Sequence, residues 1–216
     1  MNVQMSDSAG GVSAIDEDAG ANISFITGRL WTGGDLHSEL GQEAMLADLA
    51  QIQDVGITDI LDNRIEWSDE EFVRAHAPDV GYLWNGADDA GQLMDDEWFD
   101  AGVDFALEAL QDPEAQVLAH CHMGINRGPS MAFAILLASG MDPVAALIAI
   151  RRARPIAVIA YDADALDWWH RKTDAPALVA NSQRAAVTAW RQGNLLHLDQ
   201  IRIMRSNEDN EPSLPT

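Results

Sequence analysis

The chain has a single cysteine, Cys121, among its 216 residues, and it has no long apolar run. One cysteine cannot form an intramolecular disulfide, which suits a reducing compartment, and we expect a cytoplasmic protein. No apolar run approaches the roughly 20 residues that a bilayer requires, and residues 1–11 lack the basic start and apolar stretch of a secretory signal. Because histidines and carboxylates do not cluster at metal-ligand spacing either, the sequence argues against zinc. We expect no metal and no cofactor.

Positive charge is also scarce. The chain has 13 lysines and arginines against 35 aspartates and glutamates, a formal net charge of −22. Such a chain repels nucleic acid and anionic membranes, so we expect neither as a partner, whereas the oligomeric state stays open. A local anion site is still compatible with this charge. Surface charges are screened beyond about 8 Å at physiological salt, while groups that touch the ligand act directly.

The most informative segment runs from His120 to Ser130 and reads HCHMGINRGPS. An apolar run at 117–119 precedes it and predicts a strand, and an apolar run at 131–137 follows it and predicts a helix. A tight loop between a strand and a helix directs its N–H groups, and the positive end of the helix dipole, toward one point. The segment therefore predicts an anion-binding site.

Two side chains of this segment supply chemistry. A thiol held at such a site, as we expect for Cys121, loses its proton more readily than a free cysteine. Arg127 offers a planar pair of donors that can bind two oxygens of a phosphate at once. A thiolate nucleophile beneath a phosphate-binding loop is the equipment for phosphoryl transfer to sulfur. We call residues 121–127 the signature loop.

Hydrophobic periodicity along the chain predicts alternating strands and helices. The expected strands are 23–34 (a hairpin), 57–61, 82–85 and 116–120, and the expected helices are 39–55, 99–110, 128–139, 143–152, 162–174 and 182–194. Residues 195–205 fit either a helix or a strand. This order predicts an α/β fold, a three-layer α/β/α domain with a central, mostly parallel sheet of four to five strands, plus a C-terminal helical extension. The site then lies beyond the carboxyl end of a central strand.

The signature loop resembles that of the cysteine-dependent protein tyrosine and dual-specificity phosphatases, His-Cys-x-x-Gly-x-x-Arg. Four other stretches are similar to the same family: RLWTGG (29–34), DILDNRIEW (59–67), the stretch 82–110 and IRRARPIAVIAY (150–161). The resemblance spans about residues 23–170. It implies a catalytic domain at 21–170. The composition of residues 1–20, rich in glycine, serine, alanine and aspartate, indicates a disordered segment. The sequence pattern predicts a helical extension and polar tail at 171–216, outside the resemblance.

The resemblance also implies roles for individual residues. Cys121 is the nucleophile, Arg127 binds phosphate, and Asp89 is the general acid, with Asp88 as the alternative. Asp95 and Asp96 stand just before a helix and are expected to be solvated or helix-capping residues. The loop residues expected to bind substrate are His122, Met123, Gly124, Ile125 and Asn126.

Three further residues are assigned by the same resemblance. Arg64 is expected to contact substrate at the pocket rim, and His120 to be a buried residue that holds the loop. Gly128 departs from the family, which usually has a serine or threonine there to donate to the departing thiolate. The pair Asn126-Arg127 is similar to RNA 5′-triphosphatases of the same superfamily.

These observations favour a phosphatase that acts on phosphotyrosine through a cysteinyl-phosphate intermediate. Phosphoserine and phosphothreonine are additional candidate substrates. Two alternatives stay open. Gly128 is compatible with a phosphate-binding module that turns over poorly. Asn126 is compatible with an RNA 5′-triphosphatase, which the acidic composition and the expected aspartate acid disfavour. The partner is then a phosphorylated protein or peptide; small phosphates such as phosphoinositides are a further alternative.

Overall fold

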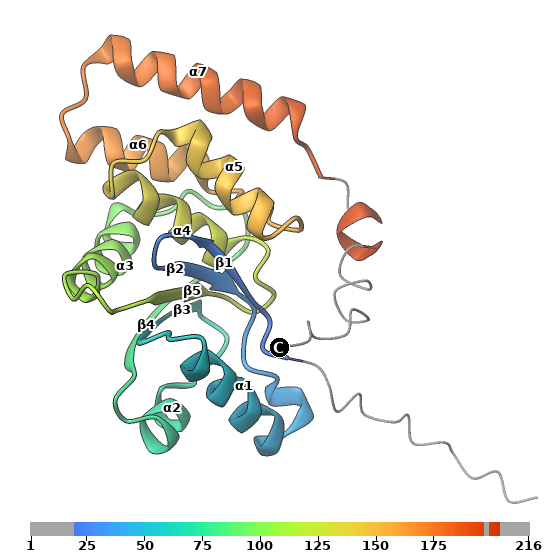
Figure 1. The fold of residues 1–216 in the computed structure, drawn as a ribbon. Helices are drawn as coiled ribbons and strands as arrows, with labels where there is room; N and C mark the ends of the chain where they lie inside the picture. The colour runs from blue at the N-terminus through green and yellow to red at the C-terminus, as the bar shows by residue number, and fades with distance from the viewer. Residues whose placement is uncertain (1–19, 197–198, 204–216) are drawn as a thin grey trace, which may run out of the picture.

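A five-stranded sheet forms the centre of the computed structural model, which describes residues 20–196 and 199–203 (Figure 1). Its strands are β1 (Ile23–Thr27), β2 (Leu30–Gly33), β3 (Asp59–Arg64), β4 (Gly81–Ala87) and β5 (Val117–His120), in the order β1-β2-β5-β3-β4. β1 pairs antiparallel with β2, as the expected hairpin, and the other three pairings are parallel. The expected mostly parallel sheet is confirmed, with β5 at its centre.

Helices cover both faces of this sheet (Figure 1). The 3₁₀ turn η1 (Ser38–Leu40) with α1 (Gln42–Asp54) and α2 (Glu70–His76) lies on one side. The other side carries α3 (Asp96–Ala109), α4 (Arg127–Ala138), α5 (Pro143–Ala153), α6 (Asp162–Lys172) and, outermost, α7 (Ala177–Gly193). The expected three-layer α/β/α architecture is therefore confirmed.

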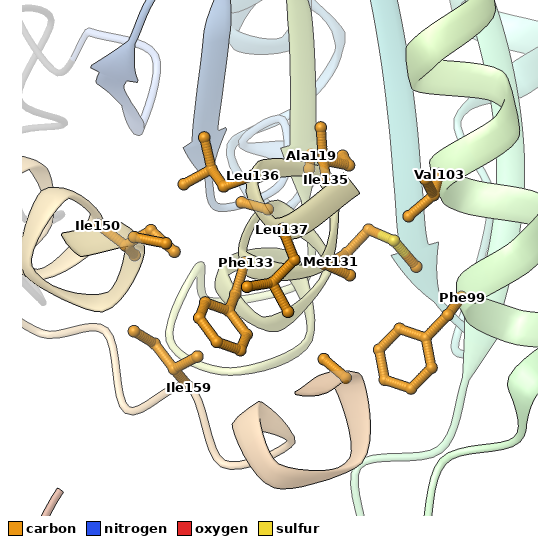
Figure 2. Close-up of a cluster of buried hydrophobic side chains, with 14 of the residues drawn as sticks. Phe99, Val103, Ala119, Met131, Phe133, Ile135, Leu136, Leu137, Ile150 and Ile159 are labelled. Atoms are coloured by element: carbon orange, nitrogen blue, oxygen red, sulfur yellow. The ribbon is translucent and has the colours of Figure 1, made fainter. Parts of the chain in front are cut away.

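The helix that follows the signature loop, α4, is the centre of the larger hydrophobic core. Every residue from Arg127 to Leu137 is buried, because β2, β5 and the helices α3, α5 and α6 surround α4. Figure 2 shows Met131, Phe133, Ile135 and Leu137 of this helix among side chains from its neighbours. A helix that is apolar on all sides is stable only when it is enclosed in this way. This enclosure fixes the start of α4, and with it the site, against the sheet.

The helices after residue 160 continue this core. Trp168 of α6 is buried and its ring lies 5.6 Å from that of Phe99. α7 packs on α5 and α6 and buries Ala180 and Val187. The proposed boundary between 170 and 171 falls in the last turn of α6, and the division into a domain and an extension stays a prediction.

Some expectations concern the ends of the chain. Residues 199–203, in the stretch that fitted either a helix or a strand, are helical. Residues 1–19 and 204–216, expected to be a disordered segment and a polar tail, lie outside the described residues. In the described part of the chain, no helix combines the length and the apolar character needed to cross a membrane.

Candidate active site

Cys121 directly follows the central strand β5, and Arg127 begins α4. The Cys121 N–H donates to the carbonyl of Gly33 on β2 (3.2 Å), which continues the parallel ladder into the loop. The cysteine is buried and its thiol is free. The sheet thus places a reduced sulfur at the carboxyl end of its middle strand, as the sequence predicts.

Four successive carbonyls of the signature loop accept hydrogen bonds from outside the loop. They are His122 from Asp35 N (3.2 Å), Met123 from Arg154 Nη2 (3.1 Å), Gly124 from Arg154 Nε (2.6 Å) and Ile125 from Val158 N (2.7 Å). In a planar trans peptide the C=O and the following N–H point in opposite directions. The N–H groups of residues 123–126 therefore point away from these donors, and together they can bind an anion.

Position 124 of this loop requires glycine. Its φ is +63°, in the left-handed region. A Cβ there would lie 2.5 Å from the carbonyl carbon of Gly33 and 2.7 Å from Arg154 Nε. Only glycine permits both the backbone conformation and the close approach. The glycine of the signature motif is thus explained by packing against β2 and Arg154.

The guanidinium of Arg127 has five N–H donors, and the protein uses three of them. Nη1 donates to Glu66 Oε2 (2.8 Å) and to the carbonyl of Ala87 (2.8 Å), and Nη2 donates to Glu66 Oε1 (2.7 Å). These bonds orient the buried side chain by its end and one edge. Hydrogen bonding from Arg127 lowers the pKa of Glu66 to about 2, so this carboxylate is charged at neutral pH.

The remaining two donors of Arg127 lie on the opposite edge. Among the described residues, nothing accepts a hydrogen bond from its buried Nε, and Nη2 keeps a second hydrogen. Burial alone would lower the pKa of Arg127, but Glu66, Cys121 and Asp89 raise it. An unpartnered N–H pair on one edge of a charged guanidinium matches two oxygens of a phosphate.

Asp89 lies at this open edge. Its Oδ2 is 3.7 Å from Arg127 Nε, and its Oδ1 accepts from Asn126 Nδ2 (2.6 Å) and from the Tyr161 hydroxyl (3.0 Å). Asp88, the alternative acid, is exposed, and no side-chain contact to the signature loop is found for it in the described chain. The structure therefore places Asp89 beside Arg127 and Asn126 of the signature loop. Its role as an acid stays a prediction.

Arg64 does not reach the pocket rim, which corrects the expectation of a substrate contact. Its side chain is completely buried and pairs with Asp62 (Nε to Oδ1 2.8 Å, Nη2 to Oδ2 2.7 Å) and with Asp69 (2.6 Å). Trp67 covers it, with the guanidinium carbon 4.9 Å from the ring centroid. An arginine enclosed by two carboxylates and an indole is held inside the protein, because exposing it would leave those charges unpaired.

The two histidines of the signature segment lie in different environments. His120 is buried, and burial lowers its pKa, so it is neutral at pH 7. Its Nε2 is 3.7 Å from Asp62 Oδ1, too far for a hydrogen bond, and its carbonyl accepts from Asn63 Nδ2 (3.0 Å). His122 is half exposed, and its Nδ1 lies 3.1 Å from Asp35 Oδ2. His120 is thus a buried support, and His122 is at the surface of the loop.

Gly128 is also enclosed by backbone. A Cβ at this position would lie 2.9 Å from the Ala119 carbonyl oxygen and 2.9 Å from the His120 carbonyl carbon. The departure from serine or threonine thus coincides with a close approach of α4 to β5. The Asn126 side chain is oriented by two bonds, since its Nδ2 donates to Asp89 and its Oδ1 accepts from Ala160 N (2.6 Å). Its Nδ2 has a second N–H.

Three residues that contact the site were not assigned from the sequence. Glu66 orients Arg127, Arg154 holds the loop carbonyls, and Tyr161 binds Asp89. Arg154 and Tyr161 both lie in the stretch 150–161 that resembles the phosphatases, and an arginine before a proline at a helix end was the available signal. No local pattern distinguishes Glu66 from its acidic neighbours. Within residues 20–196 and 199–203, no three histidine, cysteine or carboxylate side chains are grouped to hold a metal ion.

No protein-family model matches the chain. Solved structures do match it. Tk-PTP in its active form is 19% identical with a TM-score of 0.55, over 69% of this chain and 97% of that chain. PTPMT1 in complex with PI(5)P is 20% identical with a TM-score of 0.57, over 71% and 97% of the two chains. Human DUSP28 is 14% identical with a TM-score of 0.53, over 70% and 95%.

These similarities define the fold of this chain as that of the tyrosine and dual-specificity phosphatases. The fold-level resemblance inferred from the signature motif is confirmed. At 14–20% identity the similarity concerns the fold, and the chemistry rests on the residues of this chain.

The packing of Gly124 gives a first prediction. Gly124→Ala should abolish the rise in Tm that inorganic phosphate causes, because the new Cβ displaces either Gly33 or Arg154 and distorts the anion-binding loop. Gly140→Ala is the matched control, since Gly140 also has a positive φ (+86°) but no atom within 4 Å of the added Cβ. Both variants should lose roughly 1 kcal/mol of stability from the backbone conformation. An equal phosphate-dependent rise in Tm for both variants would contradict this account.

Proposed function

We propose that this protein is a protein phosphatase that works through a cysteinyl-phosphate intermediate. The observation that carries the proposal is the open edge of Arg127, whose two unpartnered donors lie beside Asp89 and interact electrostatically with Cys121. In this proposal, a phosphate bound by this edge and by the loop N–H groups lies between the Cys121 sulfur, as the nucleophile, and the Asp89 carboxyl group, as in-line transfer requires.

In the first step the Cys121 thiolate attacks phosphorus. The S–P bond forms as the P–O bond to the substrate breaks, and Asp89 gives its proton to the departing oxygen. Arg127 and the N–H groups of residues 123–126 bind the phosphate oxygens, whose charge they stabilise as the transition state forms. Proton transfer to the leaving group typically contributes about 10²–10⁴-fold in rate.

In the second step water hydrolyses the cysteinyl phosphate. The Asp89 carboxylate takes a proton from the attacking water, the new P–O bond forms, and the S–P bond breaks to release inorganic phosphate and the thiolate. Asp89 thereby regains the proton it donated, and the cycle needs no cofactor.

We infer that the substrate is a phosphorylated protein, and that the enzyme hydrolyses phosphotyrosine and also phosphoserine or phosphothreonine. Arg64 and Arg154 lie near the signature loop, but both are buried and hold carboxylates or loop carbonyls. The carboxylates of Asp35, Glu66 and Asp89 lie around the site. A single phosphate suits this distribution better than a polyanion does, since the described residues offer a second phosphate no additional buried cation at the site.

Other phosphate substrates are weaker candidates for this reason. PTPMT1 is known in complex with PI(5)P, but a phosphoinositide carries more than one phosphate group. A triphosphate-ended RNA has the same disadvantage, and the side chain of Asn126, which favoured it, binds Asp89 and Ala160. A phosphate-binding module without turnover is the remaining alternative, and Gly128 is the observation in its favour.

The decisive experiment measures phosphate release from four substrates: a phosphotyrosine peptide, a phosphothreonine peptide, triphosphate-ended RNA and PI(5)P vesicles. We expect release from the phosphotyrosine peptide to be fastest. Cys121→Ser should abolish release and keep peptide binding, because the alcohol is a poor nucleophile but the loop and Arg127 remain. Arg127→Lys should be equally severe, since an ammonium cannot make the two-donor contact, whereas the surface change Arg184→Lys should have no effect.

Three outcomes would contradict the proposal. Equal activity of Cys121→Ser would exclude a cysteine nucleophile. Binding of phosphopeptide by the wild type without release would indicate a binding module. Preferred release from RNA or PI(5)P would replace the proposed substrate class.

Asp89→Asn should lower kcat/KM about 10²-fold or more for an alkyl phosphate. For an aryl phosphate with an activated leaving group, which needs no proton, the loss should be small. Asp88→Asn is the matched control, since it removes a neighbouring exposed carboxyl group. If Asp88→Asn shows the large loss for the alkyl phosphate and the small loss for the aryl phosphate, and Asp89→Asn does not, the acid is Asp88.

Gly128 should make the second step slow. Without a hydroxyl beside the sulfur, the departing thiolate lacks a hydrogen bond worth about 1.5–3 kcal/mol, a roughly 10- to 150-fold effect on rate. Rapid mixing with an activated aryl phosphate should show a burst of about one equivalent of the phenol, followed by a slow steady rate.

A matched pair of variants isolates the hydroxyl at position 128. Gly128→Ala and Gly128→Ser both introduce the Cβ that approaches Ala119 and His120, and they differ only in the hydroxyl. The serine variant should have a higher steady rate and a smaller burst than the alanine variant. The absence of a burst in the wild type would show that hydrolysis does not limit turnover.

A further inference from the structure

We propose that Tyr161 is a positioning residue for the general acid: its hydroxyl, together with the Asn126 amide, fixes which oxygen of Asp89 carries the proton. This inference rests on the proposed function, because it concerns the first step of that mechanism. The observation behind it concerns the two oxygens of the Asp89 carboxylate. One oxygen accepts hydrogen bonds from two donors, and the other lies beside the edge of Arg127 that binds phosphate in the proposed function.

The Tyr161 hydroxyl has one proton, and its partners determine where that proton points. The hydroxyl donates this proton to Asp89 Oδ1, 3.0 Å away, because a carboxylate oxygen only accepts. Burial, and then the hydrogen bond to Asp89, raise the pKa of Tyr161, so it stays protonated at neutral pH. Tyr161 thus holds the loop that carries the acid.

Asn126 donates to the same carboxylate oxygen from the other side. Its Nδ2 lies 2.6 Å from Asp89 Oδ1, and its orientation is fixed because its Oδ1 accepts from Ala160 N (2.6 Å). A carboxyl oxygen that accepts two hydrogen bonds is the carbonyl oxygen of the protonated acid, so the proton resides on the other oxygen. That oxygen, Oδ2, is 3.7 Å from Arg127 Nε, beside the edge of Arg127 that binds the phosphate in the proposed function.

The segment that carries Tyr161 is itself rigid. The tyrosine is buried, and its N–H donates to Ser130 Oγ on α4 (3.3 Å). Ile159 in the preceding turn has φ +56°, an unusual conformation for a β-branched residue, and its side chain is completely buried. Val158 N also donates to the signature loop at Ile125 (2.7 Å). One segment therefore holds the phosphate-binding loop and the acid in a fixed relation.

The test uses the dependence of kcat/KM on the leaving group, since kcat/KM reports the steps up to formation of the cysteinyl phosphate. Tyr161→Phe keeps the ring and removes the donor. We expect kcat/KM to fall about 10-fold or more for an alkyl phosphate and less than about 2-fold for an activated aryl phosphate. The matched control is Tyr82→Phe, because Tyr82 is the only other tyrosine and its hydroxyl also donates to an aspartate, Asp62 (2.6 Å). Its ratio of the two rates should equal that of the wild type.

A second measurement separates positioning from general damage. In the Asp89→Asn background, Tyr161→Phe should cause no further loss for the alkyl phosphate, because the acid through which the tyrosine acts is already absent. Equal losses for both substrates, or the same loss with and without Asp89, would show that Tyr161 is only structural and would overturn the inference.

The outcome also distinguishes this inference from the proposed function. If Asp89→Asn depends on the leaving group and Tyr161→Phe does not, the mechanism stands and the role of Tyr161 is wrong. If Asp89→Asn shows no such dependence, the assignment of the acid fails, and the inference fails with it.

Discussion

The site depends on the hydrogen bonds that Arg154 makes to the carbonyls of Met123 and Gly124. A loop of six or seven residues has many conformations, and in most of them the N–H groups point in different directions. Arg154 binds two consecutive carbonyls from one side, and therefore turns the N–H groups that follow them to the other side. The arginine is buried, and it also donates to Ser24 and Asn22 near β1. The conformation of the loop is thus connected to the edge of the sheet.

A second feature is that the protein binds only part of the Arg127 guanidinium. Glu66 and the Ala87 carbonyl accept hydrogen bonds from its end and one edge, so these bonds already order the side chain. The other edge keeps two donors, which bind an oxyanion in the proposed function. Because the arginine is already ordered, this binding requires no further loss of its side-chain entropy. The overall charge of −22 does not oppose this, because the donors contact the ligand at hydrogen-bond distance, whereas the distant acidic side chains are screened by salt.

The sequence predicted the layers of the fold and the position of Cys121 at the end of the central strand, because strand, loop and helix are local patterns with distinct periodicities. It also indicated Asp89, which the structure places beside Arg127. Arg64 was placed wrongly at the rim. Its burial depends on Asp62, Asp69 and Trp67 closing around it, and no local pattern reports such tertiary pairing. Glu66 and Tyr161 were missed for the same reason, since each acts across more than 60 residues of sequence.

The environment of Gly128 links the packing of the core to the chemistry of the site. α4 is enclosed on all sides, and its first turn approaches β5 so closely that a Cβ at 128 would contact the backbone of Ala119 and His120. The same approach brings the first turn of α4, which begins at Arg127, close to the end of β5, which Cys121 follows. A side chain at 128, and with it the hydroxyl that would donate to the departing thiolate in the proposed mechanism, therefore requires α4 to shift away from β5. In the proposed mechanism, the donors left for the departing thiolate are the backbone N–H groups of the loop and the second N–H of Asn126 Nδ2, because the other bonds of that side chain go to Asp89 and Ala160.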